Sequence, residues 1–485
     1  MAVYRPCYRN CSHVLILLIC VFRVTCRSID ISKFRARDDC GSDPAWKPSV
    51  DAWQQAKTDK NFAQWWQSTS AANTSSNLAN ALASHFGDHI TGFSCGINSQ
   101  GTCALPGCQP YVDSGDEPWT YQALAAVVNL NTFFDRLYDG ITDGQADYEG
   151  LASDIAQTFF PWQDPKFGAN DAAVWIGATV GALFTFIAPE SRLVAAGARA
   201  IAAFVDGGAQ EAQIQLTPDS GLTLNQGIAL ISEAASQAAQ QSRNSIESWA
   251  SVLFSGGEDE ANNTILDYSK GGGFVAGDLP SNTMFENFWK MSLISRTINS
   301  QWTTDKNFVT FARTTDQDIS VGPEISRYYS NETGGVYYLY QWNKKKLQMP
   351  KGMMSLQHPE YNIQPSDVTA SSARAFEVAG FNYTPSVALD RIKSSIFNNT
   401  FAPLTEGSRW EGLWTLPVCD MGDNVQWNGL YGESNMAPCC CGPDCRDTKT
   451  FVELANLKGV NSYRNQCSKQ LKGTSINFTN IDYGF

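Results

Sequence analysis

Four aspartates recur at every fourth position and form the most regular group of side chains that could do chemistry. They are Asp135, Asp139, Asp143 and Asp147. On a helix this spacing places the carboxylates on one face, where several oxygen ligands could bind calcium. The spacing does not match a calcium-binding loop, and Gly140 and Gly144 are expected to end the helix inside the series. We therefore predict a solvated acidic face and no metal ion.

Three carboxylates just upstream could serve the hydrolysis of glycosidic bonds. They are Asp113, Asp116 and Glu117. That reaction needs two carboxyl groups at a set distance, which a sequence does not reveal. The chain has 48 acidic residues, so any choice of a pair is arbitrary and we assign no catalytic residue.

Two histidines, His85 and His89, have the spacing of a shared zinc site on a helix. The glutamate of the metalloprotease helix is missing, Gly87 weakens the helix, and no third ligand is evident. Surface or helix-capping roles are the simpler interpretation, with a zinc site as the alternative. We predict no cofactor.

A phosphate-binding P-loop is missing from the sequence, since Gly271-Gly272-Gly273 lacks the lysine and the Ser/Thr. Trp410, Trp414 and Trp427 could stack on sugars, although packing around disulfides is the commoner use. The run Lys344 to Lys346 is typical of a strand edge or loop tip rather than a site for an acidic partner. Enzymatic activity stays open, and a non-enzyme is favoured.

Cysteine usage indicates an oxidising compartment. Of 14 cysteines, ten follow the N-terminal segment, and this even number suits a disulfide framework. The ten are Cys40, Cys95, Cys103, Cys108, Cys419, Cys439, Cys440, Cys441, Cys445 and Cys467. The first four allow three pairings and the last six allow 15. Disulfides are favoured over a thiolate metal site in the second group.

The N-terminus is typical of a secretory signal over residues 1–26. Arg5 and Arg9 precede the apolar run Val14 to Phe22, and small residues follow. A retained anchor is the alternative, because Arg23 directly follows the run. A pro-segment to residue 37 is a further alternative, because Phe34-Arg35-Ala36-Arg37 suits a protease that cuts after basic residues.

Six N-x-[ST] sequons follow the signal and predict a glycoprotein. Their asparagines are Asn73, Asn262, Asn331, Asn382, Asn398 and Asn477.

The elements that would position these groups fall into three regions. Residues 38–116 are an N-terminal disulfide-bonded region with helices over 51–67 and 77–86. Residues 117–302 are a helical domain. One helix starts at Glu117-Pro118, and three further helices cover 151–160, 224–254 and 284–302. Residues 303–485 are a mixed α/β, cysteine-rich region. Its strands cover 308–312 and 336–342, a turn covers 331–335 and a helix covers 387–397.

The most apolar stretch of the mature chain is residues 172–205, two arms separated by Pro189-Glu190-Ser191-Arg192. The first arm has 17 residues, about 25 Å as a helix, which is the lower bound for a membrane span. The second has 13 residues and contains Arg199, whose charge is costly in a bilayer. We favour a buried hairpin at the hub of the helical domain, with one span or a conditionally inserted hairpin as alternatives. Gly177, Gly181 and Gly197 are then close-packing points.

Composition limits the partners. The 485 residues are 43% hydrophobic and include 14 tryptophans, which excludes a disordered chain. A net charge of −13 argues against nucleic acid and anionic lipid as electrostatic partners. Contact with a membrane through residues 172–205 remains open. No other partner is indicated.

Several motifs together resemble a known family. They are Cys40-Gly-Ser-Asp-Pro44, the loop Cys103 to Tyr111, the helix end Asn131 to Tyr138, the small-residue apolar run after Ile176 and the cysteine-rich end. Over most of the chain after residue 38, the sequence resembles an uncharacterised family of secreted fungal proteins, a domain of unknown function. The resemblance implies an extracellular fungal protein and brings no catalytic residues. The triple cysteine 439–441 departs from it.

The sequence thus predicts a secreted, disulfide-bonded, mainly α glycoprotein. Its helical domain surrounds a central apolar hairpin, and a smaller α+β cysteine-rich part follows. The first hypothesis is a non-enzymatic extracellular factor, an effector or toxin-like protein that meets a membrane. The alternative is an extracellular hydrolase that acts on glycans through carboxylates.

Overall fold

The computed structural model describes residues 43–72, 77–85, 93–97, 102–160, 224–258, 263–277, 279–305, 307–313, 322–343, 346–380, 383–384, 387–388, 391 and 411–420. The predicted signal, the pro-segment and the apolar hairpin 172–205 with Gly177, Gly181 and Gly197 lie outside these residues. So do most of the predicted helix 387–397 and the cysteines from Cys439 onward.

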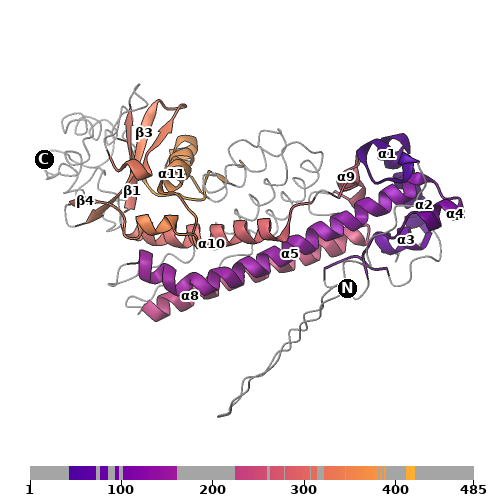
Figure 1. The fold of residues 1–485 in the computed structure, drawn as a ribbon, viewed down its shortest axis with the longest axis horizontal. Coiled ribbons are helices and arrows are strands. Elements are labelled where there is room, and N and C mark those ends of the chain that lie inside the picture. Colours follow the sequence, from indigo (N-terminus) through magenta and orange to yellow (C-terminus); the bar gives the residue numbers. More distant parts are fainter. Residues whose placement is uncertain are drawn as a thin grey trace, which may run out of the picture.

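The described part of the chain is mainly helical, with a small β part, as predicted. Helices make up 62% of it, and its strands form one mixed sheet of five strands. The molecule is elongated: one long helix, α5, runs from a cluster of short helices at one end toward the sheet at the other (Figure 1).

Helix α5 (Pro118–Phe159) is the central element and continues without a break for 42 residues. Glu117 precedes it in an extended conformation, and Pro118 takes the first helical position, where no backbone N–H is needed. Leu124, Phe134 and Ile141 are among its fully buried side chains. The segment 151–160, predicted as a separate shorter helix, is the last part of α5.

The prediction that Gly140 and Gly144 end this helix is wrong. Both glycines lie where α10 (Asn282–Thr304) crosses α5. A Cβ at Gly140 would lie 2.4 Å from Cβ of Phe285, and one at Gly144 would lie 2.6 Å from the carbonyl oxygen of Glu286. The close approach of α10 requires glycine at both positions, and its packing outweighs the roughly 1 kcal/mol that a helical glycine costs.

Two further helices pack along α5. Helix α8 (Leu224–Phe254) has the predicted bounds, and α10 extends the predicted 284–302 at both ends. The ring of Trp249 in α8 meets that of Phe134 at 4.6 Å, edge to face. The hydroxyls of Tyr148 in α5 and Thr297 in α10 are 2.8 Å apart.

The N-terminal region forms a cluster of short helices at one end of α5 (Figure 1). The helix predicted over 51–67 is two helices, α1 (Val50–Gln55) and α2 (Thr58–Ala72). The reason is Lys57, whose φ of 51° turns the backbone between them. Helix α3 (Leu78–His85) lies within the predicted 77–86, and η2 (Pro44–Trp46), α4 (Gln109–Ser114) and α9 (Ile265–Ser269) were not predicted.

The sheet has the strand order β2-β3-β1-β5, and β4 pairs with β3. Its strands are β1 (Asn307–Arg313), β2 (Tyr328–Ser330), β3 (Gly335–Asn343), β4 (Lys346–Gln348) and β5 (Val418–Asp420). The predicted strands 308–312 and 336–342 lie within β1 and β3, and the predicted turn 331–335 joins β2 to β3. Strand β5 runs parallel to β1, and the other pairings are antiparallel.

Helix α11 (Pro365–Ala379) packs on β3 and β2 and was not predicted. Its buried positions are mostly Ala, Ser and Thr, so they lack the apolar period of the longer helices. The short helices η3 (Glu324–Ser326) and η4 (Met353–Gln357) flank it.

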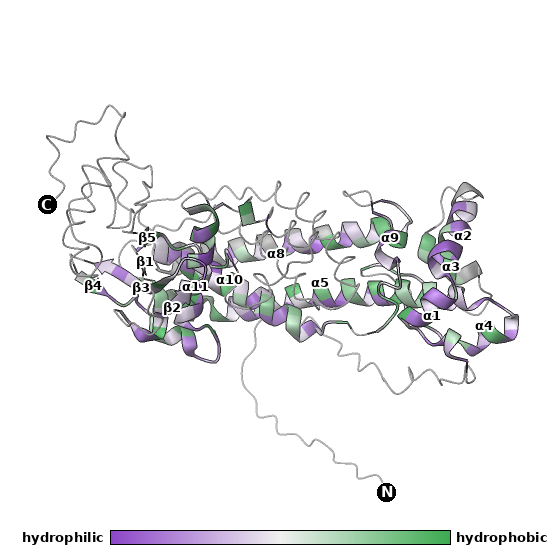
Figure 2. Ribbon diagram, turned by 90° about the horizontal axis from the view of Figure 1, so that it is seen from above, coloured by the Kyte–Doolittle hydropathy of each residue, from purple (hydrophilic) through white to green (hydrophobic). Residues whose placement is uncertain are grey.

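The helices are amphipathic, with hydrophobic and hydrophilic positions mixed along each (Figure 2). No helix in the described ranges has the length and hydropathy needed to cross a bilayer.

Candidate polar cleft beside the Cys95–Cys103 disulfide

A polar cleft lies where α3, the loop around Cys95 and the last turns of α8 meet. Its volume is about 500 Å³. Its polar lining consists of Asn77, Asn244, Glu247, Ser248 and Ser251. Cys95, Gly96, Ile97 and Phe254 complete the lining. We call it the disulfide cleft. Its volume lies in the range of small-molecule sites.

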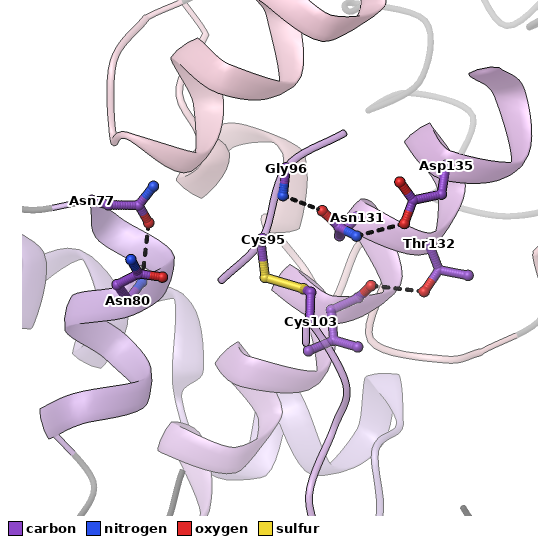
Figure 3. Close-up of a disulfide and its surroundings, with 9 residues drawn as sticks. Asn77, Asn80, Cys95, Gly96, Cys103, Asn131, Thr132 and Asp135 are labelled. Atoms are coloured by element: carbon purple, nitrogen blue, oxygen red, sulfur yellow. Dashed lines mark hydrogen bonds between the residues drawn. A yellow bond between two sulfur atoms is a disulfide. The ribbon is translucent and has the colours of Figure 1, made fainter. Parts of the chain in front are cut away.

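A disulfide and a side-chain hydrogen bond hold one wall of the disulfide cleft. Cys95 is bonded to Cys103, with an S–S distance of 2.02 Å. The N–H of Gly96 donates to Oδ1 of Asn131 on α5 at 2.7 Å (Figure 3). The loop is therefore tied both to its own continuation and to the central helix.

The disulfide settles part of the predicted framework. Of the three pairings open to Cys40, Cys95, Cys103 and Cys108, the structure selects one that joins Cys95 to Cys103. Cys108, which caps α4, is also disulfide-bonded, as is Cys419 in β5.

Asp135 extends the hydrogen-bond chain away from the cleft. Nδ2 of Asn131 donates to Oδ2 of Asp135 at 2.7 Å (Figure 3). Burial, with a further contribution from the neighbouring charge of Asp139, raises the pKa of Asp135 to about 6. The pKa of Asp139 is also raised, through desolvation and then the charge of Asp143.

The prediction of a solvated acidic face is therefore wrong for Asp135, which is partly buried. It holds for Asp143 and Asp147, which are exposed. Oδ2 of Asp147 forms an ion pair with Nζ of Lys290 in α10, at 3.0 Å. Such an exposed pair contributes little to stability.

The three carboxylates considered for glycoside hydrolysis, among which no pair was assigned, each have a local partner. Asp113 accepts from the side chain of Gln109, Asp116 from that of Ser114, and Glu117 from the indole of Trp119. These bonds serve α4 and the start of α5, and none involves the disulfide cleft.

The histidines do not form a metal site among the described residues. His85 is the last residue of α3, and His89 lies outside the described ranges. His358 contacts Glu360 at 3.4 Å, and both side chains are exposed. Within the described ranges no cluster of three or more His, Cys, Asp or Glu side chains could hold a metal ion.

Other predicted residues have the following places. Asn331 is exposed in the β2–β3 turn, and the other five sequon asparagines lie outside the described residues. Trp414 is fully buried against Trp302, with ring centroids 5.9 Å apart, so it packs rather than offering a face to a sugar. Trp410 and Trp427 lie outside the described residues. Lys346 is the first residue of β4 and pairs with Asn343, the last residue of β3.

A second hollow lies between α10 and the segment after η4. It measures about 340 Å³ and has Met284, Phe288, Met291 and Tyr361 in its lining. It is mainly apolar, and its charged lining residues are Lys290 and Glu360.

Sequence reasoning missed the polar lining of the disulfide cleft. Asn244, Ser248 and Ser251 lie on the polar side of α8, where the sequence pattern resembles any solvated helix face. The one available signal was the half-cystine Cys95, which brings a loop to that face.

No known protein family, curated protein or solved structure matches the chain. The resemblance to a secreted fungal family therefore remains a prediction from the sequence motifs.

Proposed function

We propose that the protein is a non-enzymatic extracellular binding protein that holds a small carbohydrate in the disulfide cleft. The observation that carries the proposal is the lining: two amides, two hydroxyls and one carboxylate in a cleft of about 500 Å³. Amides and hydroxyls both donate and accept hydrogen bonds, which matches the mixed donors and acceptors of a sugar.

The extracellular location rests on covalent chemistry. Stable disulfides such as Cys95–Cys103 are typical of secreted proteins. The predicted signal over residues 1–26 and the exposed sequon at Asn331 support the same location and a glycoprotein.

The binding function is tested with an array of neutral oligosaccharides, followed by isothermal titration of any sugar that binds. Ser251→Trp fills the cleft from an exposed position on α8 and is expected to weaken binding at least about tenfold. Ser153→Trp makes the same change at an exposed serine of α5 outside the cleft and should leave binding unchanged. Equal affinities for the two variants would contradict the proposal.

One observation favours the alternative of a glycan hydrolase. The lining of the disulfide cleft includes one carboxylate, Glu247. The reaction also needs a second carboxyl group at a set distance. The test is release of reducing ends from any oligosaccharide that binds. Hydrolysis that disappears in Glu247→Gln while binding persists would replace the binding function with an enzyme.

A further inference from the structure

A segment of residues 411–420, which starts with a turn, contacts α10 and α11 before it joins the sheet. We call it the strap. Its apolar side chains Leu413, Trp414 and Leu416 are almost completely buried. Up to Pro417 its main chain is bound largely by side chains of the two helices.

The α10 side of this contact consists of Arg296 and Asn299. Nη1 of Arg296 donates to the carbonyl oxygens of Gly412 at 3.3 Å and Leu413 at 3.2 Å. Oδ1 of Asn299 accepts from the N–H of Thr415 at 2.8 Å. Both side chains are buried.

The α11 side consists of two serines. Oγ of Ser371 accepts from the N–H of Trp414 at 2.9 Å and donates to its carbonyl oxygen at 3.4 Å. Oγ of Ser372 accepts from the N–H of Leu416 at 3.3 Å. The two helices thus bind the strap through its backbone, as a neighbouring strand would.

From Pro417 onward the strap is bound by the sheet rather than by the two helices. The N–H of Val309 in β1 donates to the carbonyl oxygen of Pro417 at 2.8 Å, and β5 then pairs with β1 in parallel. Addition of a strand to a sheet edge, with side chains in flanking pockets, is a common mode of peptide recognition.

The polar residues of α10 and α11 fit this mode. Polar groups in a helix–helix contact are costly unless they are hydrogen-bonded. Here Arg296, Asn299, Ser371 and Ser372 face main-chain atoms of the strap, whereas the buried Trp289 of α10 packs against α5. Trp414 supplies the anchor, against Trp302.

An ion pair secures the first residue of the strap. Glu411 is 4% exposed and accepts from Nε and Nη2 of Arg391 at 2.6 and 2.9 Å. The hydroxyl of Tyr383 donates to the same carboxylate at 2.8 Å.

We propose that the groove between α10, α11 and β1 is an exchangeable peptide-binding site whose resident ligand is the chain's own strap. The groove recognises an extended backbone, a tryptophan at the position of Trp414 and aliphatic side chains beside it. A second copy of the strap, supplied as a separate peptide, competes for the same site.

Hydrogen exchange of the intact protein tests whether the strap leaves on its own. The amides of Trp414, Thr415 and Leu416 should exchange at least about tenfold faster than those of Tyr338 and Leu339 in β3. Equal rates mean that the strap separates only with global unfolding, and they overturn the proposal.

Peptide uptake tests the site itself. The probe is a fluorescent peptide with the sequence of residues 411–418, Glu-Gly-Leu-Trp-Thr-Leu-Pro-Val, and the readout is anisotropy. Trp414→Ala in the full chain weakens the resident strap and should raise uptake at least about tenfold over wild type. Trp289→Ala removes another fully buried tryptophan, which packs against α5, and should not.

Two controls keep the test decisive. A peptide with alanine in place of the tryptophan should not bind. If Trp414→Ala does not fold, Glu411→Gln weakens the strap at its first residue and should also raise uptake. Equal uptake by the strap variant and by Trp289→Ala overturns the proposal.

Discussion

Burial changes the acid–base behaviour of individual carboxylates in this protein. It raises the pKa values of Asp135 and Asp305 to about 6 each. At Asp305 a hydrogen bond from Gln301 and the charge of Lys351 oppose the rise without cancelling it. Desolvation disfavours the charged form, and at Asp135 the charge of Asp139 raises the pKa further.

The first prediction concerns the dependence of stability on pH. Because the folded-state pKa of Asp135 lies above its ordinary 3.8, the folded chain binds the proton more tightly than the unfolded chain. Stability should therefore increase as pH falls from about 7.5 to about 5. Asp135→Asn should flatten this rise in thermal melts, whereas Asp113→Asn, at an exposed position of α4, should not. A wild-type melting temperature that falls over this range would contradict the assignment.

The second prediction concerns disulfide connectivity. Cys95 and Cys103 are paired, and Cys108 is disulfide-bonded. Within the N-terminal group of four this leaves Cys40 for Cys108. Mass spectrometry of a non-reducing digest should find a peptide that joins them. A Cys108 peptide linked to a cysteine of the C-terminal group would refute this pairing.

At the scale of elements, the contact between α5 and α10 explains the length of α5. Glycine usually weakens a helix, yet α5 passes Gly140 and Gly144 because α10 packs directly on them. The described part of the chain shows close packing at a small-x3-small spacing at Gly140 and Gly144. Gly177 and Gly181, for which the sequence predicts the same kind of packing, lie outside the described residues.

The third prediction tests that contact with a matched pair. Gly144→Ala places a methyl group 2.6 Å from a backbone carbonyl of α10 and should destabilise the protein by roughly 1 to 3 kcal/mol. Gly150→Ala lies in the same helix, with no atom within 4 Å of the new methyl group, and should be neutral or stabilising by up to about 1 kcal/mol. Denaturant unfolding measures both. Similar losses for the two variants would show that the helix crossing is not as close as described.

At the scale of the whole molecule, α5 connects the short-helix cluster that carries one wall of the disulfide cleft with the sheet and the strap (Figure 1). One hydrophobic core includes Trp53 near the first end, Trp289 in α10 and Trp414 in the strap. A ligand in the cleft and a peptide in the groove would thus bind to opposite parts of one packed scaffold.

The fourth prediction addresses the membrane hypothesis, which rests on residues 172–205. If this segment meets a bilayer, the protein should float with liposomes and release a trapped dye at some pH. Gly181→Arg adds a charge that costs about 2.5 to 3.5 kcal/mol at mid-membrane and should abolish both effects. Gly150→Arg, in open space on α5, is the control. The membrane hypothesis fails if no wild-type binding or leakage occurs at any pH.

The sequence predicted the elements whose signals are local. The apolar period of 3.6 residues placed α8 and α10, and aromatic and β-branched runs placed β1 and β3. It failed for α11, whose buried face is small and polar, and at Lys57, whose turn has no glycine to mark it.

By itself the sequence determined the mainly helical class, the position of most long elements and the chemistry that each side chain can offer, because these depend on neighbours in the chain. Only the tertiary structure decided that Gly140 and Gly144 continue a helix and that Asp135 is partly buried. It also decided that the serines of α11 bind a backbone and that Asn77 meets α8 in one cleft. Each of these depends on contacts between residues far apart in the sequence, and such contacts set both packing and desolvation.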